Sequence, residues 1–265
     1  KCASAISARP SKMPVNLPQA ILMDLDDTII SYEAVAGRVW LEVCTEFANQ
    51  LVGTAPEQLA CAIDEYRKWY WADPRRHREG RLNLAPAQID VVEGAFRLLG
   101  VEPPTVVEEI GQMYAERRQQ EISLFPGAVE TLQSLKESGV RMALVTNGTP
   151  STQRPKIERF GLEGYFHHIQ IEGEAGYGKP DPRAYRHAMA KISSISSETW
   201  MVGDNLEWEV VAPQRLGITG VWHDWRGHGL PKDSTVRPDR IIRSLPELLQ
   251  VPLSQPGRRV SCRRT

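Results

Sequence analysis

Four short groups of polar residues hold the side chains that could do chemistry together: carboxylates, a hydroxyl, an amide and a lysine. The groups are Asp24-Leu25-Asp26-Asp27-Thr28, Thr146-Asn147-Gly148, Gly178-Lys179-Pro180-Asp181-Pro182 and Gly203-Asp204-Asn205. Carboxylates that lie close together repel one another unless a cation lies among them. Oxygen ligands without His or Cys favour Mg²⁺ over zinc. The residue types therefore predict a magnesium site, provided that the fold brings the four groups together.

The same residue types suit phosphoryl transfer. A carboxylate beside a bound metal can attack phosphorus and form an acyl phosphate. A second carboxylate two residues later can protonate the leaving oxygen and then deprotonate water. Lysine and threonine can bind the equatorial oxygens, where negative charge develops.

Short apolar runs precede these groups and are typical of buried parallel strands. The runs are 20–23, 140–145, 168–171, 199–202 and 218–222, and they alternate with amphipathic segments at 128–137, 153–160, 182–191 and 206–216. Strands that alternate with helices predict βαβ units and one parallel sheet. The carboxyl ends of its strands meet at one edge, which is where ligands bind in such sheets. We therefore expect all four polar groups at that edge.

Between the first strand and the rest, residues 31–122 show helical periodicity only. Apolar stripes predict four helices, beginning near Val35, Pro56, Ile89 and Thr105. The predicted fold is α/β: a Rossmann-like parallel sheet with helices on both faces and an inserted four-helix cap. The predicted boundaries are an irregular tail at 1–16, a core domain at 17–30 plus 123–251, a cap domain at 31–122 and a basic tail at 252–265.

Composition limits the class of protein. The chain has 265 residues, 41% of them hydrophobic and 25% charged, and a formal net charge of −1. These values are typical of a globular protein and give no general attraction for nucleic acid or anionic membranes. The longest apolar runs fall short of the roughly 18 residues that span a bilayer. The four cysteines include no CxxC pair, so we expect a reducing cytoplasm. The sequence leaves open the oligomeric state and whether its start at Lys1 is a fragment or a processed end.

The ordered set DxDxT, TN, KP and GD resembles the haloacid dehalogenase (HAD) superfamily, and the helical insert resembles its helical-cap branch. That branch includes phosphatases of sugar phosphates and nucleotides. The resemblance implies Mg²⁺-dependent hydrolysis of a small phosphorylated metabolite through an aspartyl-phosphate intermediate. It implies that Asp24 is the nucleophile, Asp26 the general acid/base, and Thr146, Asn147 and Lys179 the residues that bind the phosphoryl group.

For the metal, the resemblance implies direct binding by Asp24, the backbone carbonyl of Asp26, and Asp204. The last motif usually reads GDxxxxD, whereas this chain has Glu209 at the final position. Its longer side chain is expected to orient metal-bound water, with Asn205 as a further candidate beside the metal and Glu207 as an alternative to Glu209.

Three other functions remain open on this sequence. A 2-haloacid dehalogenase uses the same nucleophile without a metal, but it lacks the second acid that Asp26 supplies. A phosphomutase and a non-catalytic binding protein are the others. In the cap, the segment Trp69–Arg81 is rich in aromatic and basic residues. Such a segment could be a cap loop that meets an anionic substrate and stacks an aromatic ring on it. We favour the structural interpretation, in which its aromatic residues, like Trp200 and Trp208, pack internally and its arginines face water.

Overall fold

The computed structural model describes residues 17–51 and 53–250, and its centre is a six-stranded parallel sheet with the order β5-β4-β1-β6-β7-β8. The strands of this sheet are β1 (Ala20–Met23), β4 (Arg141–Thr146), β5 (His168–Ile171), β6 (Thr199–Gly203), β7 (Thr219–His223) and β8 (Arg240–Ile242). The five strands predicted from the sequence are confirmed to within one residue. The three-residue strand β8 is an addition. The tails predicted at 1–16 and 252–265 lie outside the described residues.

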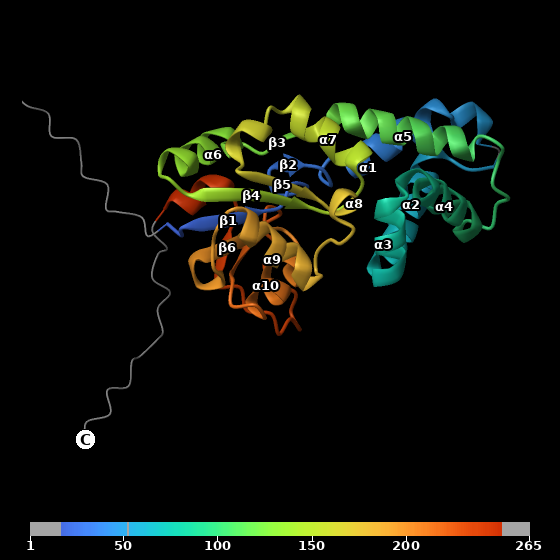
Figure 1. Ribbon diagram of the computed structural model, residues 1–265. Coiled ribbons are helices and arrows are strands. Elements are labelled where there is room, and N and C mark those ends of the chain that lie inside the picture. Colours follow the sequence, from blue (N-terminus) through green and yellow to red (C-terminus); the bar gives the residue numbers. More distant parts are fainter. Residues whose placement is uncertain (1–16, 52, 251–265) are drawn as a thin grey trace, which may run out of the picture.

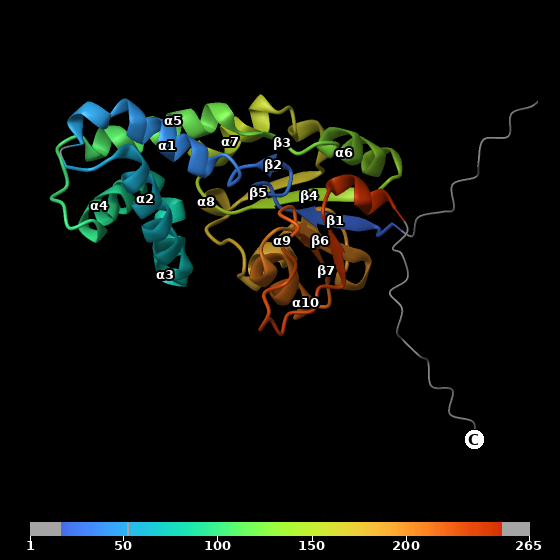
Figure 2. The same cartoon turned by 180° about the vertical axis from the view of Figure 1, so that it is seen from behind.

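Helices cover both faces of the sheet, as Figures 1 and 2 show. The helices are α6 (Ala128–Glu137) and α7 (Pro150–Arg159) on one face, and α9 (Pro182–Lys191) and α10 (Ala212–Gln214) on the other. The central strand β1 is buried on both sides because its side chains alternate. Ile21 and Met23 pack into the cluster of α6 and α7, whereas Ala20 and Leu22 pack into the cluster of α9. The predicted α/β class with covered faces is confirmed.

Short elements complete the core. They are η2 (Glu163–Tyr165), α8 (Glu172–Ala175), η3 (Ser196–Glu198), the π-helical turn η4 (Leu206–Val211) and η5 (Leu245–Leu249). A small antiparallel pair, β2 (Ile30–Ser31) with β3 (Ser123–Leu124), lies where the chain leaves the core and returns. The cap between them lies at one end of the sheet, and the described ends of the chain lie at the opposite end (Figure 1).

The cap contains five α-helices in the described residues, one more than the sequence predicted. They are α1 (Ala36–Glu46), α2 (Pro56–Ala72), α3 (Pro74–Leu82), α4 (Leu84–Leu98) and α5 (Val107–Glu121), with the 3₁₀ turn η1 (Ala48–Gln50) after α1. Helix α3 escaped prediction because it has no apolar stripe: only Gly80 of its nine residues is buried. Its start does carry a signal, since Asp73 accepts a hydrogen bond from the Arg76 amide and Pro74 occupies the first turn.

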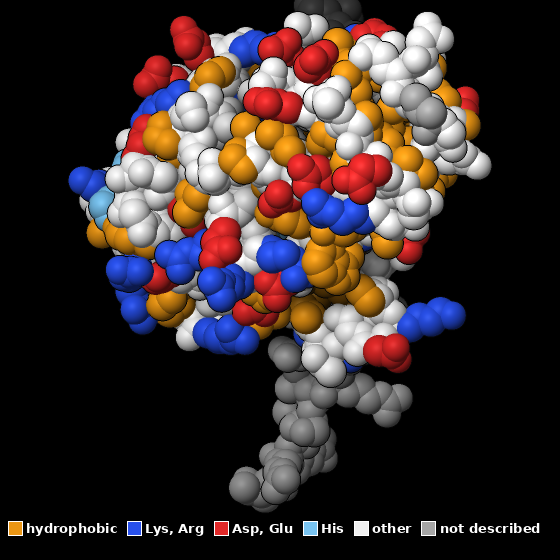
Figure 3. All heavy atoms as spheres, turned by 90° about the vertical axis from the view of Figure 1, so that its right-hand side faces the viewer, with side chains coloured by type: hydrophobic (Ala, Val, Ile, Leu, Met, Phe, Trp, Pro, Cys, Tyr) orange, Lys and Arg blue, Asp and Glu red, His pale blue; other side chains and the backbone are white. Residues whose placement is uncertain are grey.

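The cap has an apolar core of its own. Residues of α1, α2, α4 and α5 form one buried cluster, in which the rings of Trp40 and Tyr114 stack at 3.5 Å between centroids. On the outer end of the cap, charged side chains of both signs are spread over the surface, with Lys and Arg more frequent in the lower part of the view (Figure 3). None of the helices described is long and apolar enough to cross a membrane.

Candidate active site

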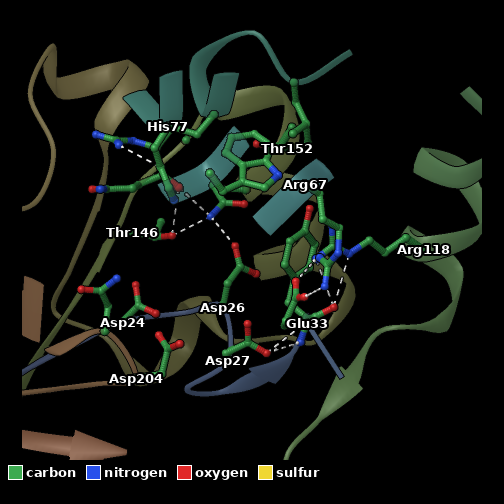
Figure 4. A pocket seen from close by; sticks show the side chains of 18 of the residues that line it. Asp24, Asp26, Asp27, Glu33, Arg67, His77, Arg118, Thr146, Thr152 and Asp204 are labelled. Atoms are coloured by element: carbon green, nitrogen blue, oxygen red, sulfur yellow. Dashed lines mark hydrogen bonds and ion pairs between the residues drawn. The ribbon is translucent and has the colours of Figure 1, made fainter. Parts of the chain in front are cut away.

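Three of the polar groups converge because β1 lies between β4 and β6. Met23 is paired with Leu144 on one side and with Val202 on the other. The residues that follow, Asp24 and Asp204, and Thr146 at the end of β4 therefore meet at one edge of the sheet. They line a cavity of about 740 Å³ whose other wall comes from the cap. These polar side chains lie together at the strand ends, as the sequence predicted, and Figure 4 shows them around the cavity.

Lys179 is the centre of the buried charge cluster. Its side chain is completely buried, and its Nζ lies 2.5 Å from Asp24 Oδ1 and 2.7 Å from Glu209 Oε1. Burial alone would lower the pKa of Lys179, but the two neighbouring carboxylates outweigh it and raise the pKa. Lys179 is therefore charged and held against the oxygen that is the expected nucleophile.

Asn147 fixes the backbone of Lys179. Its Nδ2 donates to the Lys179 carbonyl oxygen at 2.7 Å, and its Oδ1 accepts from the Lys179 amide at 2.8 Å. This reciprocal pair gives Asn147 a positioning role. Its expected contact with a substrate stays a prediction.

Glu209 also serves Lys179 and the loop beside it. Its second oxygen, Oε2, accepts from the Asn205 amide at 2.8 Å. A Cβ at Gly203 would lie 2.1 Å from Glu209 Cγ, so glycine is needed there for the side chain to pass. Both carboxylate oxygens of Glu209 bind protein donors, which differs from the expectation that it orients metal-bound water. Burial raises the pKa of Glu209 to about 7, although Lys179 opposes this.

Asn205 and Glu207 also differ from what the sequence suggested. Asn205 Oδ1 accepts hydrogen bonds from the amides of Glu207 and Trp208, so it caps the π-helical turn η4. The Glu207 side chain pairs with Arg215 at 3.0 Å on the surface. Neither contact points to the metal.

The expected donor set for a metal consists of the carboxylates of Asp24 and Asp204 and the backbone carbonyl of Asp26. Burial, followed by the charges of Glu209 and Asp24, raises the pKa of Asp204 well above its ordinary value. Burial also raises the pKa of Asp24, against the effect of Lys179. A divalent cation between the two would favour their ionised forms, so these residues fit Mg²⁺. In the described part of the chain, no three His, Cys, Asp or Glu side chains form a metal-binding group, and the expected set needs only two.

Asp26 is held by two residues that the sequence analysis did not single out. Lys156 Nζ lies 2.8 Å from both of its carboxylate oxygens, and Gln153 Nε2 donates to Oδ2 at 3.0 Å. Gln153 also donates to Thr146 Oγ1 at 2.6 Å. Both partners lie on α7, three residues apart and therefore on one face of the helix. That spacing after the TN motif is the signal from which they could have been predicted.

The Trp69–Arg81 segment differs from expectation in two ways. Trp69 is 54% exposed instead of buried, and the Arg76 guanidinium covers its ring at 3.8 Å. Arg81, expected to face water, forms two hydrogen bonds to Glu172 of the core at 2.7 and 2.8 Å. Together with Trp71, His77 and Trp208, Arg81 lines the cavity.

Trp200, one of the two tryptophans outside the cap that were expected to pack internally, packs against the apolar core. Trp208 instead contributes to the cavity wall, where its ring meets that of His77 edge-on at 5.0 Å between centroids. Burial and then the nearby Arg81 lower the pKa of His77, which favours the neutral ring.

Comparison with known proteins identifies the family. The model of the haloacid dehalogenase-like hydrolases matches residues 18–217, and the chain belongs to this family. It is therefore a hydrolase. The structure is similar to that of the putative HAD-hydrolase YfnB from Bacillus subtilis bound to magnesium, with a TM-score of 0.68 at 22% identity. That similarity covers 88% of this chain and 97% of the other and concerns the fold.

Two curated relatives are phosphatases. The chain is 35% identical to the phosphoserine phosphatase of Thermus thermophilus over 179 residues. These aligned residues are 67% of this chain and 65% of that relative, slightly less than two thirds of the relative's length. The chain is 29% identical to the ribulose-1,5-bisphosphate 5-phosphatase of Halopiger xanaduensis, and the aligned region covers 77% of this chain and 84% of that relative.

Proposed function

We propose that this protein is a Mg²⁺-dependent phosphatase that hydrolyses a small phosphomonoester through an aspartyl-phosphate intermediate. The named relatives support a hydrolase that acts on phosphoric monoesters. The single observation that carries the proposal is the position of Asp24. It lies at the end of the central strand, in contact with a charged Lys179 and beside Asp204, at the floor of the cavity.

In the first step, a carboxylate oxygen of Asp24 forms a bond to phosphorus while the bond to the leaving oxygen breaks. Asp26 takes part in this step in its protonated form: it gives its proton to that oxygen, and the alcohol departs. Lys179 and Thr146 bind the equatorial oxygens as charge develops on them. Asp24, the backbone carbonyl of Asp26, and Asp204 would hold Mg²⁺, which would supply neutralisation of the charge on the phosphoryl group.

In the second step, Asp26 removes a proton from water, and the water oxygen bonds to phosphorus. The acyl-phosphate bond breaks, inorganic phosphate forms and Asp24 returns to its free carboxylate. The cap excludes bulk water and selects the leaving group. A small phosphorylated metabolite in the cytoplasm remains the predicted partner.

The second acid favours this function over its rivals. A dehalogenase does not need the proton that Asp26 transfers, yet here Lys156 and Gln153 hold the Asp26 carboxylate at the cavity. A phosphomutase would return the phosphoryl group to an alcohol, and a product analysis with labelled water separates it from a phosphatase.

The test is phosphate release from p-nitrophenyl phosphate with Mg²⁺ and with EDTA, for the wild type, Asp24→Asn and Asp233→Asn. Asp233 is an exposed loop acid away from the cavity and serves as the matched control. We expect turnover that EDTA removes, that Asp24→Asn abolishes because an amide cannot attack phosphorus, and that Asp233→Asn retains. Wild-type rates in a folded Asp24→Asn protein would falsify the nucleophile assignment.

A further inference from the structure

The cap side of the cavity holds two arginines that share one carboxylate. Arg67 of α2 and Arg118 of α5 both line the cavity and both bind Glu33, which lies between β2 and α1. Arg118 Nη2 is 3.2 Å from Glu33 Oε2, and Arg67 Nη2 contacts Oε1. Figure 4 shows the two guanidinium groups together above the Glu33 carboxylate. The Glu33 carboxylate therefore faces two permanent positive charges.

Asp27, a second acid on this cavity, also acts on Arg118 by its charge, but Arg226 adds a third positive charge, so an excess of positive charge remains. Asp64 binds Arg67 Nε at 3.1 Å but also pairs with Lys68, so it adds no net negative charge to the group. Arg226 lies on the same cavity and forms no ion pair within the described residues. The cap side of the cavity is thus electrostatically suited to an anion.

Both guanidiniums also keep free donors. Arg67 binds Asp64 through Nε and Glu33 through Nη2. Arg118 donates to the Tyr32 carbonyl oxygen from Nε and Nη2, both at 3.3 Å, and its Nη2 also binds Glu33. Neither Nη1 has a hydrogen-bond partner in the described part of the chain. Arg118 is only 8% exposed and lies over the Tyr32 ring at 3.5 Å, so its orientation is fixed before a ligand arrives. Fixed, unpaired donors in a cavity wall are suited to an oxyanion.

This anion-binding group is separate from the phosphoryl end. In Figure 4, Asp24 and Arg118 lie at opposite ends of the view, with Asp26 and Asp27 between them. We propose that Arg67 and Arg118, assisted by Arg226, bind a second acidic group on the leaving alcohol, a carboxylate or a second phosphate. The inference rests on the proposed phosphatase function and assigns its substrate class: phosphomonoesters of acidic alcohols.

Matched substrate pairs test it. 3-Phosphoglycerate and glycerol 3-phosphate differ by a carboxylate, and glucose 1,6-bisphosphate and glucose 6-phosphate differ by a phosphate. Charge-assisted hydrogen bonds are strong enough to change affinity by about 10–100-fold. We therefore expect the acidic member of at least one pair to have a kcat/KM at least about tenfold higher, and the pair that responds identifies the acidic group.

The variants Arg67→Gln and Arg118→Gln should lower that ratio by about tenfold or more, because they remove charge and donors together. Arg226→Gln should lower it less, since its side chain is exposed. Arg38→Gln is the control, because Arg38 pairs with Glu42 and Glu121 outside the cavity.

A wild-type ratio near one in both pairs overturns the inference, and so does an unchanged ratio in the variants. If Arg67→Gln and Arg118→Gln do not fold, the ratios of the wild type and of Arg226→Gln still test whether the arginines bind an acidic leaving group. Failure of the proposed function looks different. The wild type would then release no phosphate from any of the four substrates, and none from p-nitrophenyl phosphate.

Discussion

The two walls of the cavity are built in different ways. On the core wall, the carboxylates of Asp24 and Glu209 converge on one buried lysine, and Gly203 leaves room for the contact. On the cap wall, arginines from α2 and α5 converge on one carboxylate, Glu33. The core wall therefore has excess negative charge around a cation, and the cap wall has excess positive charge around an anion. Under the proposed function, the core wall takes the phosphoryl end of a substrate and the cap wall its leaving group.

The largest effect that tests this division concerns Asp26, which belongs to the core wall and is the proposed proton donor to the leaving oxygen. Asp26→Asn removes the proton donor, and loss of a general acid typically costs about 10²–10⁴-fold. An alkyl phosphate should lose more than an aryl phosphate, because an aryl oxide leaves without protonation. The measurement is the rate of formation of the phosphoenzyme in a rapid-mixing experiment with both substrates.

Lys156→Gln is the companion to this variant, because it keeps Asp26 but removes its ion pair. We expect Lys156→Gln also to slow phosphoenzyme formation more with the alkyl phosphate than with the aryl phosphate. The loss of rate should be smaller than in Asp26→Asn. Equal losses on both substrates in the Asp26→Asn protein would count against proton transfer and would leave Asp26 a role in binding alone.

A smaller effect separates the metal ligands from the residues that position Lys179. Asp204→Ala should raise the Mg²⁺ requirement strongly, because it removes a direct ligand. Glu209→Gln should reduce turnover by about 10–100-fold, as supporting residues do, with little change in that requirement. Both oxygens of Glu209 bind Lys179 and the Asn205 amide, which is the reason for this difference.

Magnesium titrations of activity in the two variants measure this. Glu207→Gln is the control, because Glu207 is a surface acid on the same turn and pairs with Arg215. If Glu209→Gln raises the Mg²⁺ requirement more than Asp204→Ala does, then Glu209 binds the metal and the assignment is reversed.

The core wall could be predicted from the sequence, and the cap wall could not. Asp24, Thr146 and Asp204 follow apolar runs, and a parallel sheet brings such strand ends to one edge whatever the details of packing. Arg67 and Arg118 lie on helices of the cap. The apolar periodicity of these helices predicts which of their faces is buried, but it does not predict which polar residues face the core domain. That choice depends on the angle between cap and core, which no local pattern contains.

Hydrogen-bond partners were also beyond the sequence. Glu209 was expected to orient metal-bound water because its longer side chain stands where the motif usually has Asp, yet its contacts are with Lys179 and a backbone amide. Helix α3 has few buried residues, so hydrophobic periodicity could not find it. Its contact with the core, through Arg81, exists only in the folded arrangement of the two domains.

That contact carries the last and smallest prediction. Arg81 of the cap binds Glu172 of the core through two hydrogen bonds, and Glu172 also accepts from the Gly148 amide at 3.1 Å, in the loop that follows Thr146. The pair therefore joins the cap wall to the core wall in the arrangement that this structure has. Arg81→Gln should lower the population of that arrangement and raise KM by about 3–10-fold, because apparent affinity falls with the fraction of competent protein.

A double-mutant cycle with Glu172→Gln measures the coupling, and Arg75→Gln is the matched control on the same helix, since Arg75 pairs only with the exposed Glu79 in the described residues. We expect the effects of Arg81→Gln and Glu172→Gln on KM to be less than additive, because either change breaks the same pair. Strict additivity would mean that the two side chains act independently. Other contacts between cap and core would then maintain this arrangement, and the two walls would need no ion pair between them.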